Sequence, residues 1–149
     1  MRFLITGGAG FIGSHLVDAL VAAGHDVCVL DDFSTGKPAH LEQAQRSGKL
    51  KVVRGDVRDF SAMRAAIVGA NGVFHLAALV SVPKSLSDPR SSFEINVGGT
   101  VNVLAAARAE GVPRVVLSSS AAVYGDAPVP AHEGETPTHP LSPYALDKL

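Results

Sequence analysis

A run of glycines close to the N-terminus constrains this chain more than any other feature. The apolar segment Arg2–Thr6 leads directly into Gly7-Gly8-Ala9-Gly10-Phe11-Ile12-Gly13, and an apolar pattern of helical period follows. The run fits both G-x-G-x-x-G and G-x-x-G-x-x-G. Glycines permit a tight turn and let the backbone approach a pyrophosphate, while the start of a helix offers free N–H groups and partial positive charge. This strand–turn–helix order predicts a phosphate-binding turn.

Short apolar runs alternate with longer segments of helical period, which is typical of βαβ units around a parallel sheet. We expect an α/β fold with a doubly wound (Rossmann) parallel sheet in three αβα layers. The length and the 46% hydrophobic content suit one domain over residues 1–149. Because a sheet of this type has a sixth strand, we expect it to be incomplete at its C-terminal end. The strand candidates are Arg2–Thr6, Asp26–Asp31, Leu50–Arg54, Gly72–Leu76 and Arg114–Ser119.

The helical segments are less regular than the strands. The spacing predicts a helix over Phe11–Ala23, a shorter one after Asp59, and a long one from Asp88-Pro89 to Ala109. Gly98 and Gly99 lie inside the long helix, where close packing against the sheet would explain them. Residues 121–143 are rich in Pro, Gly, Thr and His, which predicts a long surface loop, and residues 143–149 resemble the start of a helix.

Acidic residues follow the second and third strand candidates. Asp31 comes 18 residues after Gly13, where it is placed to accept hydrogen bonds from the adenosine ribose hydroxyls. A carboxylate there would repel a 2′-phosphate, so the sequence favours NAD over NADP; the neighbouring Asp32 is a candidate for the same role. Asp56-Val57 would lie at the carboxyl edge of the sheet, where either contact with adenine or capping of the loop explains the Asp.

A serine run and a tyrosine–lysine pair form a second constellation. Ser118-Ser119-Ser120 ends the fifth strand candidate, and Tyr144 precedes Lys148 by four residues, which places both on one face of a helix. A free tyrosine is a poor base because its hydroxyl ionises near pH 10, but a neighbouring ammonium favours the phenolate. Tyr144 could then act as a general base, with a serine hydroxyl bonded to the same substrate oxygen.

Composition excludes several other classes of function. The 13 basic and 14 acidic residues give a net charge of −1, which provides no broad attraction for nucleic acid or for an anionic membrane surface. We expect no membrane span, no signal peptide, no metal site and, with Cys28 as the single cysteine, no intrachain disulfide. A cytoplasmic protein is the expectation.

Taken together, these motifs make the chain resemble the extended short-chain dehydrogenase/reductase family, in its NAD-dependent epimerase/dehydratase branch. The resemblance covers essentially the whole chain. The motifs that carry it are Thr6–Gly13, Asp31, Gly55-Asp56-Val57, His75-Leu76-Ala77-Ala78, Asn96-Val97-Gly98-Gly99-Thr100, Ser118–Gly125, and Tyr144 with Lys148.

The resemblance implies a role for each matching residue. Ser120 would be the catalytic hydroxyl, Tyr144 the base, and Lys148 the residue that binds the nicotinamide ribose and tunes Tyr144. Asn96 would hold strand and helix near the site. The residues expected to bind NAD, from the pattern and the resemblance together, are Gly7, Gly10, Phe11, Ile12, Gly13, Asp31, Asp32, Asp56, Val57, Ala77, Ala78, Leu79, Asn96, Ser118, Tyr144 and Lys148.

The residues after the catalytic serine favour one branch of the family. Nucleotide-sugar 4,6-dehydratases carry Asp-Glu there, whereas this chain has Ala121-Ala122, which cannot shuttle protons. The resemblance therefore implies a 4-epimerase of the UDP-glucose/UDP-galactose type, with a nucleotide-diphosphate sugar as substrate. A decarboxylase, a reductase, another epimerase and a non-catalytic NAD-binding module stay open.

The resemblance also bears on the extent and assembly of the protein. Family members are considerably longer and grip the sugar with a C-terminal part, so the substrate-binding domain is expected to be absent here and these 149 residues to be inactive alone. The longer parent protein would form a homodimer through a helix bundle that includes the catalytic helix.

Overall fold

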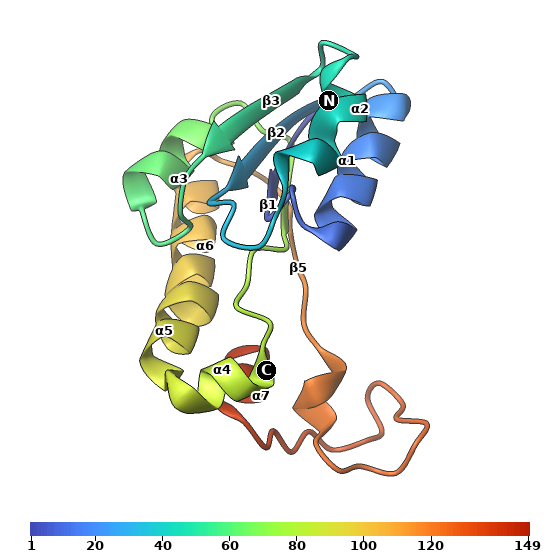
Figure 1. Ribbon diagram of the computed structural model, residues 1–149, viewed down its shortest axis with the longest axis vertical. Coiled ribbons are helices and arrows are strands. Elements are labelled where there is room, and N and C mark those ends of the chain that lie inside the picture. Colours follow the sequence, from blue (N-terminus) through green and yellow to red (C-terminus); the bar gives the residue numbers. More distant parts are fainter. The chain divides into compact units, whose positions relative to one another are not determined.

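The chain forms two compact units in the computed structural model, which describes residues 1–149. The first unit comprises Met1–Ala77 and Gly99–Leu117, and the second comprises Ala78–Gly98 and Ser118–Leu149. Each unit is therefore assembled from two separate stretches of sequence, and Figure 1 labels most of their helices and strands. None of the helices has both the length and the apolar composition needed to cross a lipid bilayer.

The first unit contains a parallel sheet of five strands. These pair in the order β3-β2-β1-β4-β5, which is the order of a doubly wound sheet through its fifth strand. The predicted fold class is therefore confirmed. The strands are β1 (Arg2–Thr6), β2 (Asp26–Asp31), β3 (Leu50–Arg54), β4 (Gly72–His75) and β5 (Val115–Leu117).

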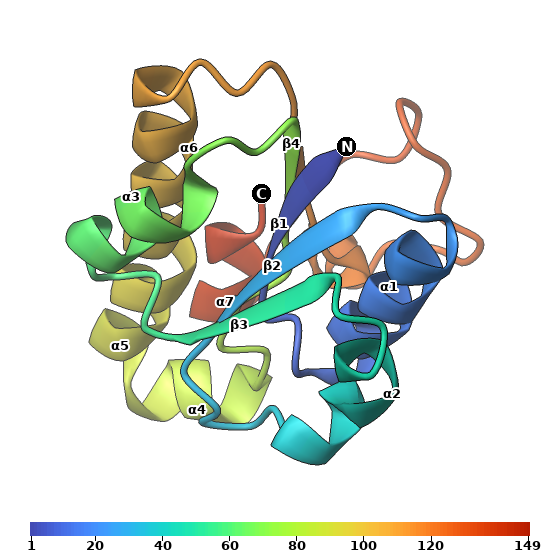
Figure 2. The same ribbon diagram turned by 90° about the horizontal axis from the view of Figure 1, so that it is seen from above.

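Helices cover both faces of this sheet, which gives the unit three layers. Helix α1 (Phe11–Ala22) lies on one face with the short elements η1 (Pro38–Leu41) and α2 (Glu42–Gln45). Helices α3 (Phe60–Ile67) and α6 (Gly99–Ala109) lie on the other face (Figure 2). Because both faces are covered, the strands need apolar side chains on both sides, and β2 is buried along almost its whole length.

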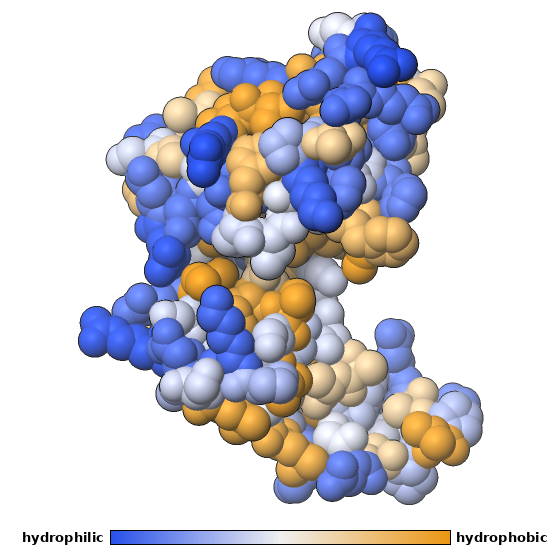
Figure 3. All heavy atoms as spheres, viewed as in Figure 1, coloured by the Kyte–Doolittle hydropathy of each residue, from blue (hydrophilic) through white to orange (hydrophobic).

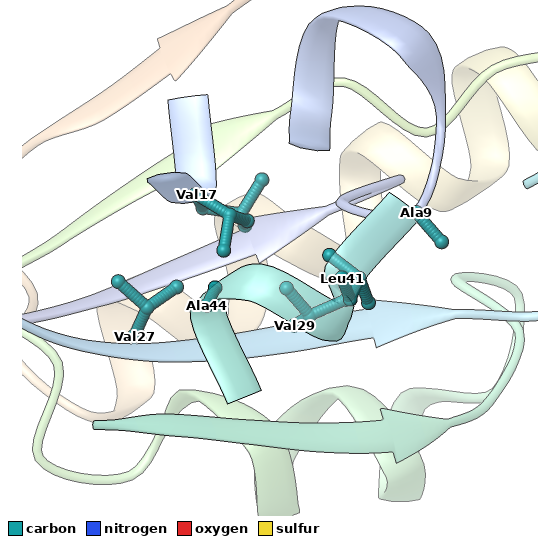
Figure 4. Packing of buried hydrophobic residues seen from close by; sticks show 7 residues of the cluster. Ala9, Val17, Val27, Val29, Leu41 and Ala44 are labelled. Carbon is teal, nitrogen blue, oxygen red and sulfur yellow. The ribbon is translucent and has the colours of Figure 1, made fainter. Parts of the chain in front are cut away.

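The packing under α1 is shown in Figure 4. Val17 of α1 meets Val27 and Val29 of β2, while Leu41 and Ala44 close the cluster from η1 and α2. All of these side chains are at most 2% exposed. Burial of a branched aliphatic side chain stabilises a fold by about 1.5–3 kcal/mol. The cluster therefore anchors the helix that follows the glycine turn.

The second unit contains short helical elements and no strand. Its first stretch forms α4 (Val82–Ser87), α5 (Pro89–Phe93) and the π-helical turn η2 (Glu94–Gly98). Its second stretch forms η3 (Ala121–Tyr124) and α7 (Pro143–Asp147). Each of these helices except η2 has a capping side chain: Ser81 caps α4, Asp88 caps α5, Ser120 caps η3 and Ser142 caps α7.

The structure departs from the sequence-based expectations mainly in the helices. The long helix expected over residues 88–109 is broken into α5, η2 and α6. Gly99 does need its small size, because an added Cβ would lie 2.5 Å from Val57 Cγ2, a loop residue rather than a strand residue. Gly98 has no such contact. The predicted loop over residues 121–143 also begins with the helical turn η3.

Candidate functional site

The glycine turn after β1 is too tight for side chains. Gly7 has φ +70°, its N–H donates to Leu30 O at 2.9 Å, and its carbonyl accepts the Gly10 N–H at 3.1 Å. A Cβ on Gly7 would lie 2.6 Å from the backbone nitrogen of Ala77, and one on Gly13 would overlap the Gly7 carbonyl oxygen. The turn therefore requires glycine at these positions.

The first backbone N–H groups of α1 have no hydrogen-bond acceptor in the protein. Gly10 is the N-cap, no side chain caps this end, and the first turn has no acidic residue. The N–H groups of Phe11, Ile12 and Gly13 have no acceptor within the helix. Together with the bare backbone of the turn, this end of α1 fits the pyrophosphate of a dinucleotide.

Asp31 is buried at the end of β2 and ties the turn to the next loop. Its Oδ2 accepts the Ala9 N–H at 2.9 Å and its Oδ1 accepts the Phe33 N–H at 2.8 Å. Each carboxylate oxygen keeps a second lone pair, which suits hydrogen bonds from two ribose hydroxyls. Asp32 is exposed, and its Oδ1 accepts the Ser34 N–H at 2.8 Å. Asp31 is therefore fixed beside the glycine turn, whereas Asp32 bonds only to its own loop.

The loop after β3 places Asp56 and Val57 differently. Val57 is 5% exposed and packs against Gly99, whereas the Asp56 carboxylate is partly exposed and is bonded to Arg58. Asp56 Oδ1 also accepts the Arg58 N–H at 2.8 Å. Asp56 therefore caps its own loop, which is one of the two roles that its sequence position suggested.

A buried hydroxyl–imidazole pair supports the segment after β4. Thr6 Oγ1 lies 2.6 Å from His75 Nδ1 and accepts the Ala77 N–H at 3.2 Å. His75 Nε2 lies 3.0 Å from Thr100 Oγ1 on α6. These bonds hold Ala77 against the glycine turn, so His75 has a structural role.

In the second unit, the Asn96 side chain forms two hydrogen bonds with the backbone of Leu79. Its Oδ1 accepts the Leu79 N–H at 2.9 Å, and its Nδ2 donates to Leu79 O at 3.2 Å. The same Nδ2 donates to Asp147 Oδ2 at 3.2 Å, and the Ser92 hydroxyl donates to that oxygen at 2.5 Å. One carboxylate thus joins η2 and α5 to the catalytic-helix candidate α7. Ala78 precedes Leu79 in this segment and is half-buried.

The serine run meets the end of α7. Lys148 Nζ donates to Ser118 O at 3.0 Å, and the Ser119 hydroxyl donates to Lys148 O at 2.8 Å. Ser120 Oγ accepts the Ala122 N–H at 3.2 Å, so its own O–H can still donate elsewhere. Ser118 therefore contributes its carbonyl oxygen here, and Ser120 keeps a hydroxyl available for a ligand.

Tyr144 is the second residue of α7 and lies one helical turn before Lys148. It is 9% exposed, and its backbone N–H donates to Ser85 Oγ on α4 at 3.1 Å. The second unit therefore carries Ser118, Ser120, Tyr144 and Lys148 within one group of packed elements, while the glycine turn, Asp31 and Asp56 belong to the first unit.

The electrostatics of Lys148 lead to a prediction. Burial lowers the pKa of its ammonium from the ordinary 10.5, and Asp147 offsets part of that effect. Between the lowered pKa and 10.5 the unfolded chain binds more protons than the folded one, so folding stability due to this group rises with pH. Urea unfolding near pH 7 and near pH 10 should show this rise, and Lys148→Met should lack it. An equal rise in both proteins would contradict the assignment.

Sequence reasoning missed the residues that support the candidate site from a distance. Ser85 and Ser92 hold α7, the latter through the Asp147 carboxylate of that helix. Asn102 Nδ2 donates to the carbonyls of Val57 and Arg58, both at 2.9 Å. Ordinary serines and asparagines at these positions give no pattern in the sequence. Only Asp147 had a signal, because it adjoins Lys148.

Comparison with known proteins gives consistent matches over nearly the whole chain. A family model described as GDP-mannose 4,6 dehydratase matches residues 4–149. The UDP-glucose 4-epimerase of Mycolicibacterium smegmatis is 44% identical over 152 residues, which cover 100% of this chain and 48% of that protein. The chain spans about half the length of the curated relatives it matches.

Solved structures of related enzymes have the same fold. The UDP-glucose 4-epimerase of Thermus thermophilus in complex with NAD gives a TM-score of 0.89 at 40% identity, covering 99% of this chain and 47% of that one. A dTDP-glucose 4,6-dehydratase of Streptomyces venezuelae with NAD bound gives 0.92 at 37% identity, covering 99% and 48%. The fold alone therefore does not separate epimerases from dehydratases.

The sheet order and the glycine turn define a Rossmann-type α/β protein. The matches to known proteins identify the family within this class. The chain belongs to the NAD-dependent epimerase/dehydratase family, and within it to the part that resembles UDP-glucose 4-epimerases.

Proposed function

We propose that this chain is the cofactor-binding portion of an NAD-dependent nucleotide-sugar 4-epimerase of the UDP-glucose/UDP-galactose type. The observation that carries the proposal is that one compact unit holds Ser120, Tyr144 and Lys148 on packed elements. A protein that only binds a dinucleotide does not need these three groups. The relatives named UDP-glucose 4-epimerase support the same reaction.

The first unit supplies the features that a dinucleotide needs. Its uncapped helix start would hold the pyrophosphate, and the buried Asp31 carboxylate would accept hydrogen bonds from the adenosine ribose. A 2′-phosphate would face the charge of Asp31, so NAD is the proposed cofactor rather than NADP. Ala77 of this unit, and Ala78 and Leu79 of the second unit, are proposed to flank the nicotinamide half. Asn96, also of the second unit, holds the backbone of Leu79.

The proposed catalysis consists of proton movements at the hydroxyl of the sugar's C4. NAD, held at the start of α1 and by Asp31, would supply reversible hydride transfer at the sugar's C4. Tyr144 Oη takes the proton of the C4 hydroxyl and gives it back in the second half of the cycle. The free O–H of Ser120 donates to the same sugar oxygen, and Lys148 is proposed to bind the nicotinamide ribose.

The turn after Ser120 favours epimerisation over dehydration. A 4,6-dehydratase needs an acid and a base to remove water across C5 and C6. This chain has Ala121 and Ala122 at the positions that follow Ser120, in the first turn of η3. Their methyl groups can neither donate nor accept a proton. Formation of a 4-keto-6-deoxy sugar by the protein would reverse this preference.

A homodimer is proposed for the whole protein. Apolar side chains reach the surface (Figure 3), and in the second unit they include Phe93 at 57% and Leu146 at 63% exposure. These line an open hollow of about 460 Å³ together with Pro89, Pro140, Leu141, Ser142, Pro143 and Asp147. Exposed apolar surface of this kind suits contact with a second protein copy. Sedimentation of the whole protein would reveal the dimer.

The test of the proposed function has two arms. The whole protein encoded by this reading frame should convert UDP-galactose to UDP-glucose without net release of NADH. The 149-residue chain should bind NAD but show no turnover, and its affinity for NADP should be lower by about tenfold or more, which corresponds to ~1.4 kcal/mol. A net absorbance change on another sugar would point to a different reaction, and equal binding of NADP would contradict the role of Asp31.

A further inference from the structure

The Asp147 carboxylate connects three elements of the second unit. Its Oδ2 accepts the Ser92 hydroxyl of α5 at 2.5 Å and an Nδ2 hydrogen of Asn96 from η2 at 3.2 Å. Ser92 and Asn96 are both buried, so water does not compete for these donors. Hydrogen bonds to a carboxylate are roughly twice as strong as those between neutral groups. Asp147 therefore fastens its helix, α7, to both neighbouring elements.

The Asn96 amide extends this connection to the backbone of Leu79. Its Oδ1 accepts the Leu79 N–H at 2.9 Å, and its Nδ2 donates to Leu79 O at 3.2 Å. An amide nitrogen carries two hydrogens, and the second can reach Asp147 Oδ2, 3.2 Å from Nδ2, and Ser92 Oγ, 3.4 Å away. The backbone segment that is proposed to flank the nicotinamide is thus joined to α7 through one amide and one carboxylate.

Helix α7 depends on such contacts for its position. It has only five residues, and a helix of this length is not stable through its own hydrogen bonds. It packs against α4 and α5 of the same unit (Figure 1). Tyr144 precedes Asp147 by three residues and Lys148 follows it directly, so a shift of Asp147 moves both. The bonds of Asp147 therefore help to fix the place of the Tyr144–Lys148 pair.

We propose that Asp147 is a positioning residue, which holds the Tyr144–Lys148 pair at a fixed place relative to the Leu79 segment. Tyr144 is the proposed base, and the Leu79 segment is proposed to flank the nicotinamide half of NAD. The placement of the base relative to the cofactor would then depend on a side chain that needs to touch neither sugar nor cofactor. The proposal rests on the proposed epimerase function of the whole protein.

The expected signature is a lower kcat with little change in KM. A displacement of about 1 Å in a reacting group can lower a rate by about 100-fold. The nucleotide sugar is expected to be gripped by the C-terminal part of the whole protein, so its binding should not depend on Asp147. A role in general stability alone would not separate the two kinetic constants in this way.

The test compares Asp147→Ala with Asp147→Asn in the whole protein. The first variant loses both bonds, whereas the second keeps an oxygen that can accept them and loses only the charge. Asp147→Ala should lower kcat for UDP-galactose by about tenfold or more and keep KM within about threefold. Asp147→Asn should recover kcat to within about threefold of the wild-type value.

The matched control is Asp59→Ala. One oxygen of Asp59 also accepts two hydrogen bonds, from the N–H groups of Ser61 at 2.9 Å and Ala62 at 3.1 Å, and these cap α3 in the first unit. The variant should lose stability in urea because the cap is lost, yet keep kcat within about threefold of the wild type. A loss of kcat as large as that of Asp147→Ala would make the effect one of general stability, against the proposal.

Hydrogen exchange of the 149-residue chain gives a readout that needs neither cofactor nor turnover. The Tyr144 N–H, which donates to Ser85 Oγ at 3.1 Å, should exchange about tenfold or more faster in Asp147→Ala than in the wild type. Asp147→Asn and Asp59→Ala should keep the rate within about threefold. An unchanged rate in Asp147→Ala would show that the carboxylate does not hold α7.

The remaining outcomes separate the two proposals. Wild-type kcat in Asp147→Ala would overturn the positioning role and leave the epimerase function standing, and faster exchange with that kcat would make the bonds a structural feature only. An equal loss of kcat in both Asp147 variants would assign the effect to the charge, against the proposal. Absence of UDP-galactose conversion by the wild-type protein would refute the proposed function, and the proposal for Asp147 with it.

Discussion

Gly7→Ala is expected to weaken NAD binding strongly and to destabilise the fold, with one of the largest effects of any single methyl group in this chain. A non-glycine residue at φ +70° costs about 1–2 kcal/mol. The new Cβ would in addition lie 2.6 Å from Ala77 N and 2.8 Å from Ala77 Cα, both backbone atoms that cannot rotate away. Overpacking of this kind adds about 1–3 kcal/mol.

Besides lowering stability, Gly7→Ala should sharply reduce the affinity of the chain for NAD. To accept the methyl group, the turn has to move away from Ala77, and the N–H groups at the start of α1 move with it. We expect NAD affinity to fall by about 100-fold or more, which is ~2.8 kcal/mol. Titration calorimetry and urea unfolding on the same samples would measure both effects.

Gly48→Ala provides a control with almost the same backbone. Gly48 has φ +71°, and an added Cβ would meet nothing within 4 Å. This variant carries the cost of the left-handed conformation alone, so it should lose about 1–2 kcal/mol of stability and retain NAD binding. If Gly7→Ala behaved like Gly48→Ala in both measurements, the close approach to Ala77 would have no role in the turn.

Tyr144→Phe is expected to remove sugar turnover while leaving the fold and NAD binding intact. The ring stays buried, and the backbone N–H still donates to Ser85 Oγ, so only the reacting hydroxyl is lost. General acid–base groups contribute about 10²–10⁴-fold to a rate, and the decrease in kcat should lie in that range. The measurement is UDP-galactose conversion by the whole protein.

The matched control is the other tyrosine of the chain. Tyr124 lies at the end of η3 and is half-buried, and Tyr124→Phe removes the same atom from the same kind of ring. It should keep wild-type kcat within about threefold, since no proton transfer depends on it. Turnover by Tyr144→Phe at more than about a tenth of the wild-type rate would rule out Tyr144 as the base.

The strands of the sheet were predictable because their burial leaves a direct mark on composition. The first three strand candidates have the bounds of β1, β2 and β3, each a run rich in Val, Ile and Leu. Strand β5 is shorter than predicted because it pairs only with β4, and the ladder extends from Val73–Val115 to His75–Leu117. Strand length there is limited by the partner, which the local sequence does not reveal.

The helices of the second unit were less predictable for a related reason. The apolar spacing from Asp88 to Ala109 continues through η2, so nothing in the pattern marks the π-helical turn. Helix α4 was not expected, because its six residues are too few for a periodic signal and include Pro83. Short elements depend on caps and tertiary contacts more than on their own sequence.

In the candidate site, too, some features could be predicted from the sequence and others could not. The spacing of the glycine turn, Asp31 and the Tyr144–Lys148 pair could be read from the sequence, because each motif is local or follows a strand end. The bond from Ser92 to Asp147 joins residues 55 positions apart and could not be read in that way. The ion pair of Arg58 with Asp56 is local, but its geometry depends on a loop conformation held by Asn102.

The interleaving of the two units has a consequence for the order in which they can form during synthesis. The first unit lacks β5 and α6 until residue 117 has left the ribosome, and by then residues 78–98 of the second are already present without their partners. The second unit becomes whole only when α7 follows. No single cut in the backbone therefore releases either unit alone and intact, and dissection of this protein requires rejoining its segments in a new order.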